Sequence, residues 1–352
     1  MSELLRKEIL NIAEYSLKQY PHRIKLNQNE NPYELPKEIK QEILDRLAVE
    51  HWSRYPTFIP REQIDKVAAF AGWRNDGVLL GNGSNDLLQL IITSVLERGK
   101  PVVISQPTFT LYKLLAQSLG ANVCEVPMVG DFKFDVDHVI RAANESNASL
   151  IILCSPNNPT GTCLSPEDVV RVLESTKSML VLDEAYVHFS HGSCSSLLAE
   201  YDRLVILQTF SKALGAAALR FGYSLASPEL TRHLGKVKLP YSINTFTLIA
   251  AEVLMARWDV IKGWIEKIVS ERDVVFRELQ TIQGLRVYES GANFLLFETL
   301  EKTPAYIFGE LLKKGILIRD VSSYPLLERG LRLSIGTPEE NREVLLAIKE
   351  AL

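Results

Sequence analysis

Seven short apolar runs between residues 78 and 227, separated by longer stretches with helical spacing, constrain the fold of this chain most strongly. The runs are VLL, PVVIS, ANVCEVPM, SLIILCS, SMLVLDEAY, RLVILQTFS and FGYSLAS. Each is rich in Val, Ile and Leu, which is typical of strands that are covered on both faces. We therefore predict an α/β domain with a mainly parallel, mixed sheet flanked by helices. In such sheets, ligands bind beyond the carboxyl ends of the strands.

After residue 240 the pattern becomes helical, and a second set of strands follows. The segment TFTLIAAEVLMARWDVIKGWIEKIVSERDVVFRELQTI has helical spacing and is long enough to connect two domains. The runs LRVYESGANFLLFET, GILIRDV and LRLSIGT then predict a small sheet. PEENREVLLAIKEAL predicts a closing helix, with Thr337 as its cap and Pro338 in its first turn.

The length of 352 residues exceeds what one compact core usually holds, so we expect more than one domain. We predict a helix and an irregular arm over residues 1–34, a large domain over residues 35–262, and a smaller α+β domain over residues 263–352.

Composition argues against several classes of function. The formal net charge is only -4, whereas a domain that binds duplex nucleic acid carries a clear basic excess, so we expect no nucleic-acid partner. No apolar stretch approaches the roughly 18 residues that span a bilayer, and we expect no membrane anchor. The N-terminal segment mixes charged residues with apolar ones, unlike a signal peptide. We therefore expect a cytoplasmic protein.

The residues that commonly bind metals show no useful spacing. The four cysteines lack paired metal-ligand spacing, and we expect reduced thiols in the core. His188 and His191 are three residues apart but have no third ligand nearby, so we interpret them as loop residues and expect no metal site.

Two turn segments follow predicted strands and could bind a ligand. GNGSND, residues 81 to 86, precedes a helical pattern; glycines permit close backbone approach, and N–H groups at the start of a helix favour an anion such as phosphate. A capped helix without a ligand would have the same sequence. SPNNPTG, residues 155 to 161, has an ordinary turn composition, but its two adjacent asparagines could hold a polar ring substituent.

Lys212 and Asp183 are the candidate reactive groups. Lys212 stands in TFSKALGAAALRFGY, after an apolar strand and eight residues before Arg220. A lysine there could be a solvated loop residue, but its place beside a candidate anion site favours a desolvated amine, which can form a Schiff base with a carbonyl. In LVLDEAYVHF, residues 180 to 189, a buried strand ends in Asp183, which places a carboxylate at the same edge of the sheet.

Seven motifs in order resemble those of the fold-type I pyridoxal-phosphate aminotransferases, and among them the histidinol-phosphate aminotransferases. They are NENPY, RYP, GNGS, SPNNPTG, DEAY, TFSKA and LRLSIGTPEEN. The resemblance covers almost the whole chain. It implies an aspartate aminotransferase-like fold, pyridoxal 5'-phosphate as cofactor, and an enzyme of class I/II.

The resemblance also implies roles for the residues around the cofactor ring. Lys212 would carry the cofactor covalently and then act as the base that moves the α-proton of the substrate. Asp183 would face the pyridine nitrogen and keep it protonated, so that the ring accepts electrons. Tyr186 and Asn158 would hydrogen-bond the phenolic oxygen of the ring, and Phe109 would stack on its face.

For the cofactor phosphate, the resemblance implies the backbone N–H groups of Ser84 and Asn85, the hydroxyl of Ser211, and the guanidinium of Arg220. Tyr55 would reach the same phosphate from a neighbouring subunit, which implies a homodimer with shared active sites.

The chain departs from the family at one position near this phosphate site. Family members commonly have Leu-Ala-Gly-Leu-Arg before the phosphate arginine, whereas this chain has Ala218 in place of the glycine. The extra methyl group is expected to affect the conformation of this loop, but not the phosphate-binding role of Arg220.

Substrate recognition is assigned to Arg332 and Arg319, with Tyr20 and Asn158. A planar guanidinium suits either a carboxylate or a phosphate, although both arginines could instead form surface ion pairs. We expect transamination between L-histidinol phosphate and 2-oxoglutarate, giving imidazole acetol phosphate and glutamate, in histidine biosynthesis.

Three alternatives remain for the activity. The segment IRDVSSYPLLERG resembles the corresponding segment of the threonine-phosphate decarboxylases, so the first alternative is decarboxylation of L-threonine O-3-phosphate. An aromatic amino acid aminotransferase would also need a pocket that accepts a ring. A non-catalytic cofactor-binding module of a regulator would need a DNA-binding domain, for which the 34 residues before the large domain are too few.

Overall fold

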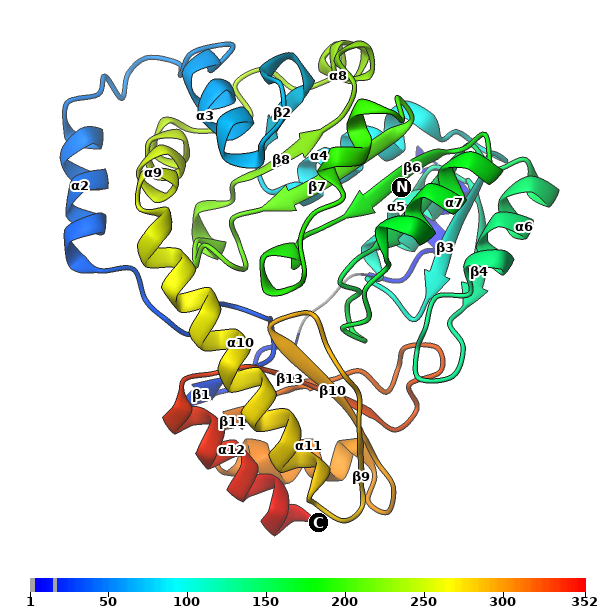
Figure 1. Ribbon diagram of the computed structural model, residues 1–352, viewed down its shortest axis with the longest axis vertical. Coiled ribbons are helices and arrows are strands. Elements are labelled where there is room, and N and C mark those ends of the chain that lie inside the picture. Colours follow the sequence, from blue (N-terminus) through cyan, green and yellow to red (C-terminus); the bar gives the residue numbers. More distant parts are fainter. Residues whose placement is uncertain (1–3, 15–17) are drawn as a thin grey trace.

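The computed structural model describes residues 4–14 and 18–352, which form two layered units joined by a long helix (Figure 1). The larger unit is built on a seven-stranded sheet with the order β2-β8-β7-β6-β5-β3-β4. Its strands are β2 (Val78–Gly81), β3 (Pro101–Gln106), β4 (Asn122–Pro127), β5 (Leu150–Cys154), β6 (Met179–Asp183), β7 (Leu204–Thr209) and β8 (Gly222–Leu225). Within this sheet, β8 runs antiparallel to all the other strands, which are parallel to one another. Each predicted run forms one strand, and the predicted mainly parallel sheet is confirmed.

Alternate residues of the central strands face two apolar layers, as the period of a strand requires. On β6, Leu180 and Leu182 pack into one layer, and Val181 packs into the other. The first layer includes residues of α3 (Arg61–Ala71), α6 (Val136–Ser146), α7 (Pro166–Ser175) and α9 (Thr245–Ala256). The second includes residues of α4 (Ser84–Val95), α5 (Leu111–Ser118) and α8 (Pro228–Gly235). Helices therefore cover both faces.

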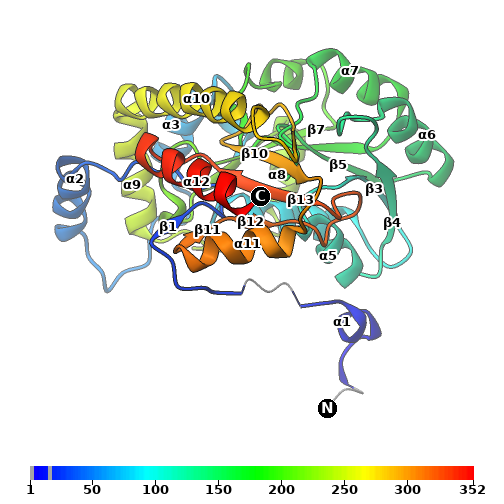
Figure 2. The same ribbon diagram turned by 90° about the horizontal axis from the view of Figure 1, so that it is seen from below.

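The smaller unit is a four-stranded antiparallel sheet with the order β12-β13-β10-β9. Its strands are β9 (Leu285–Val287), β10 (Phe294–Thr299), β12 (Arg319–Asp320) and β13 (Gly330–Ser334). Figure 2 shows the helices that surround it, which are α10 (Trp258–Gln280), α11 (Pro304–Lys313) and α12 (Pro338–Ala351). The side chain of Thr337 accepts the backbone N–H of Glu340 in a capping box, which confirms the predicted cap.

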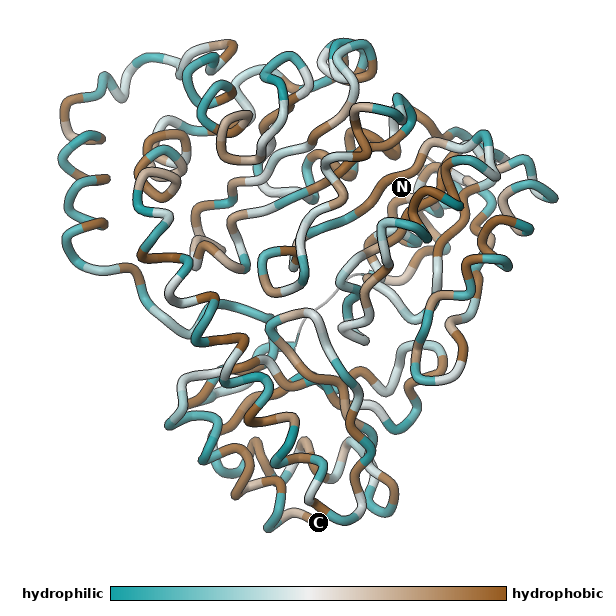
Figure 3. The backbone as a smooth tube through the Cα atoms, in the orientation of Figure 1, coloured by the Kyte–Doolittle hydropathy of each residue, from teal (hydrophilic) through white to brown (hydrophobic). Residues whose placement is uncertain are grey.

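The connection between the units differs from the prediction in one detail. The predicted continuous helical segment is interrupted at Arg257, which lies between α9 and α10. α9 is apolar on nearly every side and is buried in the large unit, whereas α10 alternates polar and apolar residues and continues into the small unit (Figure 3). The expected domain boundary after residue 262 falls inside α10.

The N-terminal arm is not wholly irregular. After α1 (Lys7–Asn11), β1 (Ile24–Lys25) pairs in parallel with β11 (Ile316–Leu317), so the arm adds a strand to the small unit. The chain then crosses to the large unit, where α2 (Lys37–Ala48) packs against α9. The remaining short helices are η2 (Asn75–Gly77), η3 (Val187–Phe189), η4 (Ser195–Ala199) and η5 (Ala217–Leu219). No helix in the described residues is both long enough and apolar enough to cross a bilayer.

Two expectations for single residues are wrong. Cys163 is exposed rather than part of the core, because it lies in the turn that leads into α7. His188 lies in η3 rather than in a loop, and its ring lies 6.1 Å from that of Phe70 and 5.3 Å from that of Trp258. Burial lowers the pKa of His188 to about 4, so the ring is neutral at physiological pH.

Candidate active site

A cavity of about 250 Å³ lies at the carboxyl ends of the central strands of the large sheet. Most of the residues that the sequence assigned to the site line it together: Ser84, Asn85, Phe109, Asn158, Asp183, Tyr186, Ser211, Lys212, Arg220, Arg319 and Arg332. The large unit supplies all of them except the last two, so the cavity lies between the two units.

Asp183 is the last residue of β6 and is buried. Tyr112 donates its hydroxyl to Asp183 Oδ2 at 2.7 Å, and the backbone N–H of Ala185 donates to Oδ1 at 3.1 Å. Burial raises the pKa of Asp183, and these two hydrogen bonds, together with the charge of Lys212, oppose that rise. Both oxygens are thus held in place. The sequence analysis did not identify Tyr112, although it lies only three residues after Phe109.

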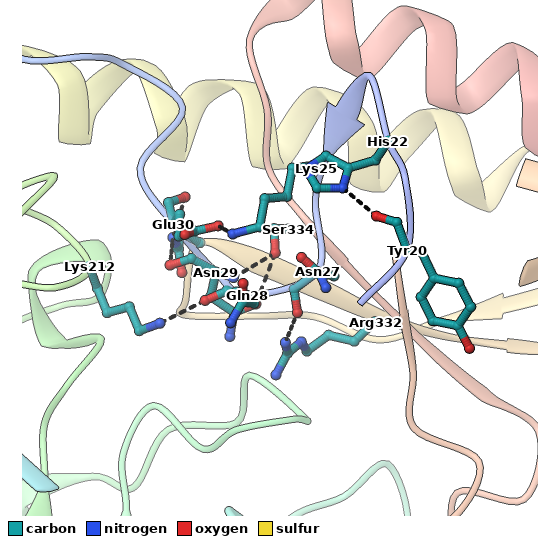
Figure 4. Close-up of polar contacts among 11 residues, drawn as sticks. Tyr20, His22, Lys25, Asn27, Gln28, Asn29, Glu30, Lys212, Arg332 and Ser334 are labelled. Carbon is teal, nitrogen blue, oxygen red and sulfur yellow. Dashed lines mark hydrogen bonds and ion pairs between the residues drawn. The ribbon is translucent and has the colours of Figure 1, made fainter. Parts of the chain in front are cut away.

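Lys212 extends toward the N-terminal arm, where its Nζ donates to the carbonyl of Gln28 at 2.7 Å (Figure 4). The same nitrogen lies 5.7 Å from the centre of the Tyr186 ring. Burial is the main cause that lowers the pKa of Lys212 to about 7, and the nearby guanidinium of Arg332 lowers it further. Glu30 acts in the opposite direction. A large fraction of the amine is therefore neutral near pH 7, as a nucleophile or a base requires.

An anion cradle lies on the other side of the cavity, where β2 leads into α4. Gly83 has φ +81, and a Cβ atom there would lie 2.6 Å from Nη2 of Arg220. A Cβ atom on Gly222 would lie 2.4 Å from the backbone nitrogen of Ser84. Arg220 Nη1 donates to Ser211 Oγ at 3.0 Å. The two glycines thus let the guanidinium and a hydroxyl approach the start of the helix, an arrangement that fits a phosphate group.

The departure at Ala218 leaves this cradle intact. Ala218 lies in η5 and is exposed, and it does not line the cavity. Arg220 follows η5 with φ +53, a left-handed conformation that turns the chain back into β8. Its side chain still lines the cavity.

Two arginines on adjacent strands of the small unit form the opposite wall. Arg332 is buried, which argues against a surface ion pair; it donates to the carbonyl of Asn27 at 2.6 Å and also to Oδ1 of Asn158. Arg319 is opposite Arg332 in the register of β12 and β13. Its guanidinium has no hydrogen bond or ion pair with any residue that the structure describes. One arginine is thus fixed by the protein, and the other is free to bind an anion.

Asn29 connects the two units beside this wall, and the sequence analysis gave it no role although it stands in the NENPY motif. Its side-chain amide donates to Tyr186 Oη at 3.0 Å, and its backbone N–H donates to Ser334 Oγ at 2.9 Å. Figure 4 shows this arm segment between Lys212 and Arg332. The arm therefore holds the Tyr186 hydroxyl in place at the carboxyl ends of the strands.

Two assigned residues lie elsewhere. Tyr55 is 81% exposed and stacks on Tyr241 with ring centroids 4.7 Å apart. Tyr20 packs edge-on against Phe308 at 5.4 Å. Neither lines the cavity of its own chain. Their assignments to the phosphate and to the substrate stay predictions.

A desolvated amine, a buried acid and an anion cradle lie together at the carboxyl ends of the strands. This arrangement defines the active site of an enzyme with an α/β fold. The model of the family "aminotransferase class I and II" matches residues 21–348. The chain belongs to this family.

The comparisons with individual proteins agree. The chain is 38% identical over 328 residues to a histidinol-phosphate aminotransferase from Chlorobaculum tepidum, covering 93% of this chain and 94% of the relative. A crystal structure of histidinol-phosphate aminotransferase from Sinorhizobium meliloti, in complex with pyridoxal-5'-phosphate, superposes with a TM-score of 0.86 at 26% identity and covers 94% of this chain and 91% of that one. L-threonine-O-3-phosphate decarboxylase from Porphyromonas gingivalis has a TM-score of 0.83 at 23% identity over 93% of this chain and 99% of that one, which shows a shared fold only.

Proposed function

We propose that this chain is a pyridoxal-phosphate-dependent aminotransferase that exchanges the amino group of L-histidinol phosphate with 2-oxoglutarate. The products are imidazole acetol phosphate and glutamate, in histidine biosynthesis. The observation that carries the reaction type is the presence of the Lys212 amine and the Asp183 carboxylate in one cavity at adjoining strand ends. The similarity to the Chlorobaculum tepidum relative, 38% identical over 93% of this chain, favours this substrate over the alternatives.

The residues present fit pyridoxal phosphate. When bound, this cofactor supplies an aldehyde that bonds to an amine and a cationic ring that accepts electrons. Lys212 would hold it covalently, and the cradle of Ser84, Ser211 and Arg220 would hold its phosphate. Asp183 would keep a proton on the ring nitrogen, because its carboxylate is fixed by two donors and shielded from water.

Proton transfer is assigned to the Lys212 amine. Because burial lowers its pKa to about 7, Nζ can accept a proton from the α-carbon of the substrate and would then donate it to the carbon that the cofactor supplies on the other side of the substrate nitrogen. The hydrogen bond from Nζ to the Gln28 carbonyl would direct the amine within the cavity. Arg332 also influences this proton transfer, because its positive charge contributes to the low pKa of Lys212.

Arg319 and Arg332 would bind the anionic group of each substrate. Histidinol phosphate presents a phosphate, and 2-oxoglutarate presents a carboxylate; a planar guanidinium can bind either with two hydrogen bonds. The free guanidinium of Arg319 supports this role, because a half-buried cation at a cavity is stabilised by an anion.

A homodimer would complete the site. Exposed aromatic and apolar side chains gather near Tyr55, which stacks on Tyr241, and include Phe58 at 63% and Leu239 at 70% exposure. A second copy would cover such a surface and would bring Tyr55 to the phosphate cradle of its partner. We place this enzyme in the cytoplasm, with small molecules as its substrates. Sedimentation equilibrium tests the dimer.

The substrate is tested by single half-reactions of the cofactor-loaded enzyme. Histidinol phosphate, phenylalanine and threonine phosphate are mixed with it separately, and the cofactor absorbance is followed. We expect rapid loss of the absorbance with histidinol phosphate and its recovery after addition of 2-oxoglutarate. Reaction with phenylalanine but not histidinol phosphate would show that the substrate is wrong. Release of carbon dioxide from threonine phosphate would favour the decarboxylase.

Tyr112→Phe is expected to lower kcat without unfolding the protein. The substitution removes the hydroxyl that donates to Asp183 Oδ2, so the pKa of the carboxyl rises further toward the value that burial alone would give. Because a hydrogen bond to a charged group contributes about 1.5–3 kcal/mol, we expect kcat to fall by about 10- to 100-fold. Steady-state kinetics measure this change.

Tyr201→Phe is the matched control for this prediction. Tyr201 also donates its hydroxyl to a carboxylate, that of Glu174 at 3.0 Å, but on the surface. We expect unchanged kcat for this variant. An equal loss in both variants would contradict the role of Tyr112.

A further inference from the structure

The loop between β12 and β13, residues 321–329, belongs to the motif IRDVSSYPLLERG, of which the proposed function uses only Arg319. Val321 and Leu327, at its two ends, are 0% exposed. Both pack in a separate apolar cluster with Met128, Phe132, Tyr288 and Leu296. Within the loop, the backbone N–H of Tyr324 donates to the carbonyl of Val321 at 2.9 Å, and that of Leu327 donates to the carbonyl of Tyr324 at 3.2 Å. The loop is therefore anchored on both sides of Tyr324.

This cluster joins the two units at the edge of the cavity. Residues 128–134, which follow β4, belong to the large unit and are closed by a bridge between Val129 and Lys133. Asp131 in this segment forms an ion pair with Arg286 of the small unit. The wall behind Tyr324 is thus held from both units.

Tyr324 lines the cavity and carries a hydroxyl that no other described residue uses. Its half-buried side chain packs against the apolar cluster and also lines the cavity together with Arg319 and Arg332. Its hydroxyl has no hydrogen-bond partner within residues 4–14 and 18–352. The other two tyrosines of the cavity, Tyr112 and Tyr186, both use their hydroxyls, with Asp183 and Asn29 as partners.

We propose that Tyr324 is a specificity-determining residue for the amino donor. Its ring packs against the planar heteroaromatic side chain of the donor, and its hydroxyl hydrogen-bonds a ring nitrogen. A phenol suits this role because it presents a flat apolar face and one polar end, and an imidazole presents the same combination. This inference rests on the proposed function, since it takes histidinol phosphate as the donor.

The second substrate pair provides an internal comparison. Glutamate and 2-oxoglutarate have no ring, so they gain nothing from a flat aromatic surface, and they would be held through their carboxylates by the arginines. Tyr324 therefore affects one half-reaction selectively. A residue that only supports the loop would affect both half-reactions.

The test measures the dissociation constant and the limiting rate of each half-reaction in Tyr324→Ala and Tyr324→Phe. For Tyr324→Ala, we expect the dissociation constant of histidinol phosphate to rise by about 10- to 100-fold, the range for lost side-chain contacts in a pocket. For Tyr324→Phe, we expect a rise of about fivefold, the effect of one neutral hydrogen bond. The dissociation constant of glutamate and the limiting rates are expected to stay at the wild-type values.

Tyr306→Ala is the matched control, because Tyr306 is an exposed tyrosine on α11 of the same unit and does not line the cavity. Equal changes for histidinol phosphate and glutamate in Tyr324→Ala would overturn the proposal in favour of a structural role, as would an unchanged dissociation constant for histidinol phosphate. A different result would identify a failure of the proposed function itself: wild-type enzyme that reacts with glutamate but not with histidinol phosphate.

Discussion

Lys212→Ala is expected to abolish transamination, with a fall in kcat of about 10⁴-fold or more, because the variant loses both a nucleophile and a general base. The amine is the one that burial and Arg332 keep partly neutral near pH 7. No other lysine lines the cavity within the described part of the chain, so none can replace it. Steady-state assays with histidinol phosphate and 2-oxoglutarate measure the loss. Borohydride reduction of the loaded wild type, followed by mass spectrometry, should locate the cofactor on Lys212.

Lys313→Ala is the control for this substitution. Lys313 is an exposed lysine that pairs with Glu310 at 2.6 Å and does not line the cavity. We expect it to keep wild-type activity. Activity of Lys212→Ala within tenfold of the wild type would contradict the assignment, as would cofactor trapped on a different lysine.

The low pKa of Lys212 also has a consequence for the stability of the cofactor-free protein. Folding lowers this pKa from 10.5 to about 7, so between these pH values the unfolded chain binds more protons than the folded one. The contribution of the group to the free energy of unfolding therefore rises with pH across this interval, and its destabilising effect is complete below about pH 7. Such a loss of stability is expected where a functional site requires a desolvated amine.

The positions of Lys212 and Asp183 could be predicted because they depend on local patterns. Each follows a buried apolar run, and strands of a parallel sheet end at a common edge. The turn that leads into α4 could be placed for the same reason, since Gly83 directly precedes a helical pattern, whereas a phosphate there was implied only by the family resemblance. For these residues, it was enough to know which strand each one follows in order to predict the edge of the sheet at which its side chain lies.

The contacts that fix these groups could not be predicted in the same way. Tyr112 meets Asp183 across 71 residues of sequence, and Asn29 meets Tyr186 across 157. Such contacts depend on which side of the sheet each helix covers and on how the arm pairs with the small unit, and neither is encoded in a local pattern. Tyr324 was missed for the same reason, because its position depends on a cluster formed by both units.

The two carboxylates of the DEAY motif separate in the structure because successive residues at the end of β6 face opposite ways. Asp183 faces the cavity, whereas Glu184 is buried on the other side. Glu184 accepts hydrogen bonds from Gln208 at 2.8 Å and from the backbone N–H of Cys194 at 2.8 Å, so it anchors the loop that follows β6. Burial raises the pKa of Glu184 to about 7. The motif thus combines a site residue with a structural one.

Asp183→Asn is expected to lower kcat by about 10³-fold, the upper end of the loss for removing one preorganised electrostatic group. The substitution keeps the shape and can still accept the hydroxyl of Tyr112, but it removes the negative charge that would hold a proton on the cofactor ring nitrogen. We expect cofactor affinity, measured by equilibrium dialysis, to fall as well.

Glu184→Gln is the matched control for Asp183→Asn, because it neutralises the adjacent buried carboxyl, which does not line the cavity. We expect its kcat and cofactor affinity to stay within about threefold of the wild type, a change of less than 1 kcal/mol, since the amide oxygen can still accept the backbone N–H of Cys194 and the amide NH2 can donate to the Ser193 hydroxyl. Equal losses in the two variants, accompanied by equal falls in Tm, would mean that the end of β6 is disturbed as a whole. A large loss confined to Asp183→Asn, with Tm unchanged, would instead separate the charge of Asp183 from its contribution to the fold.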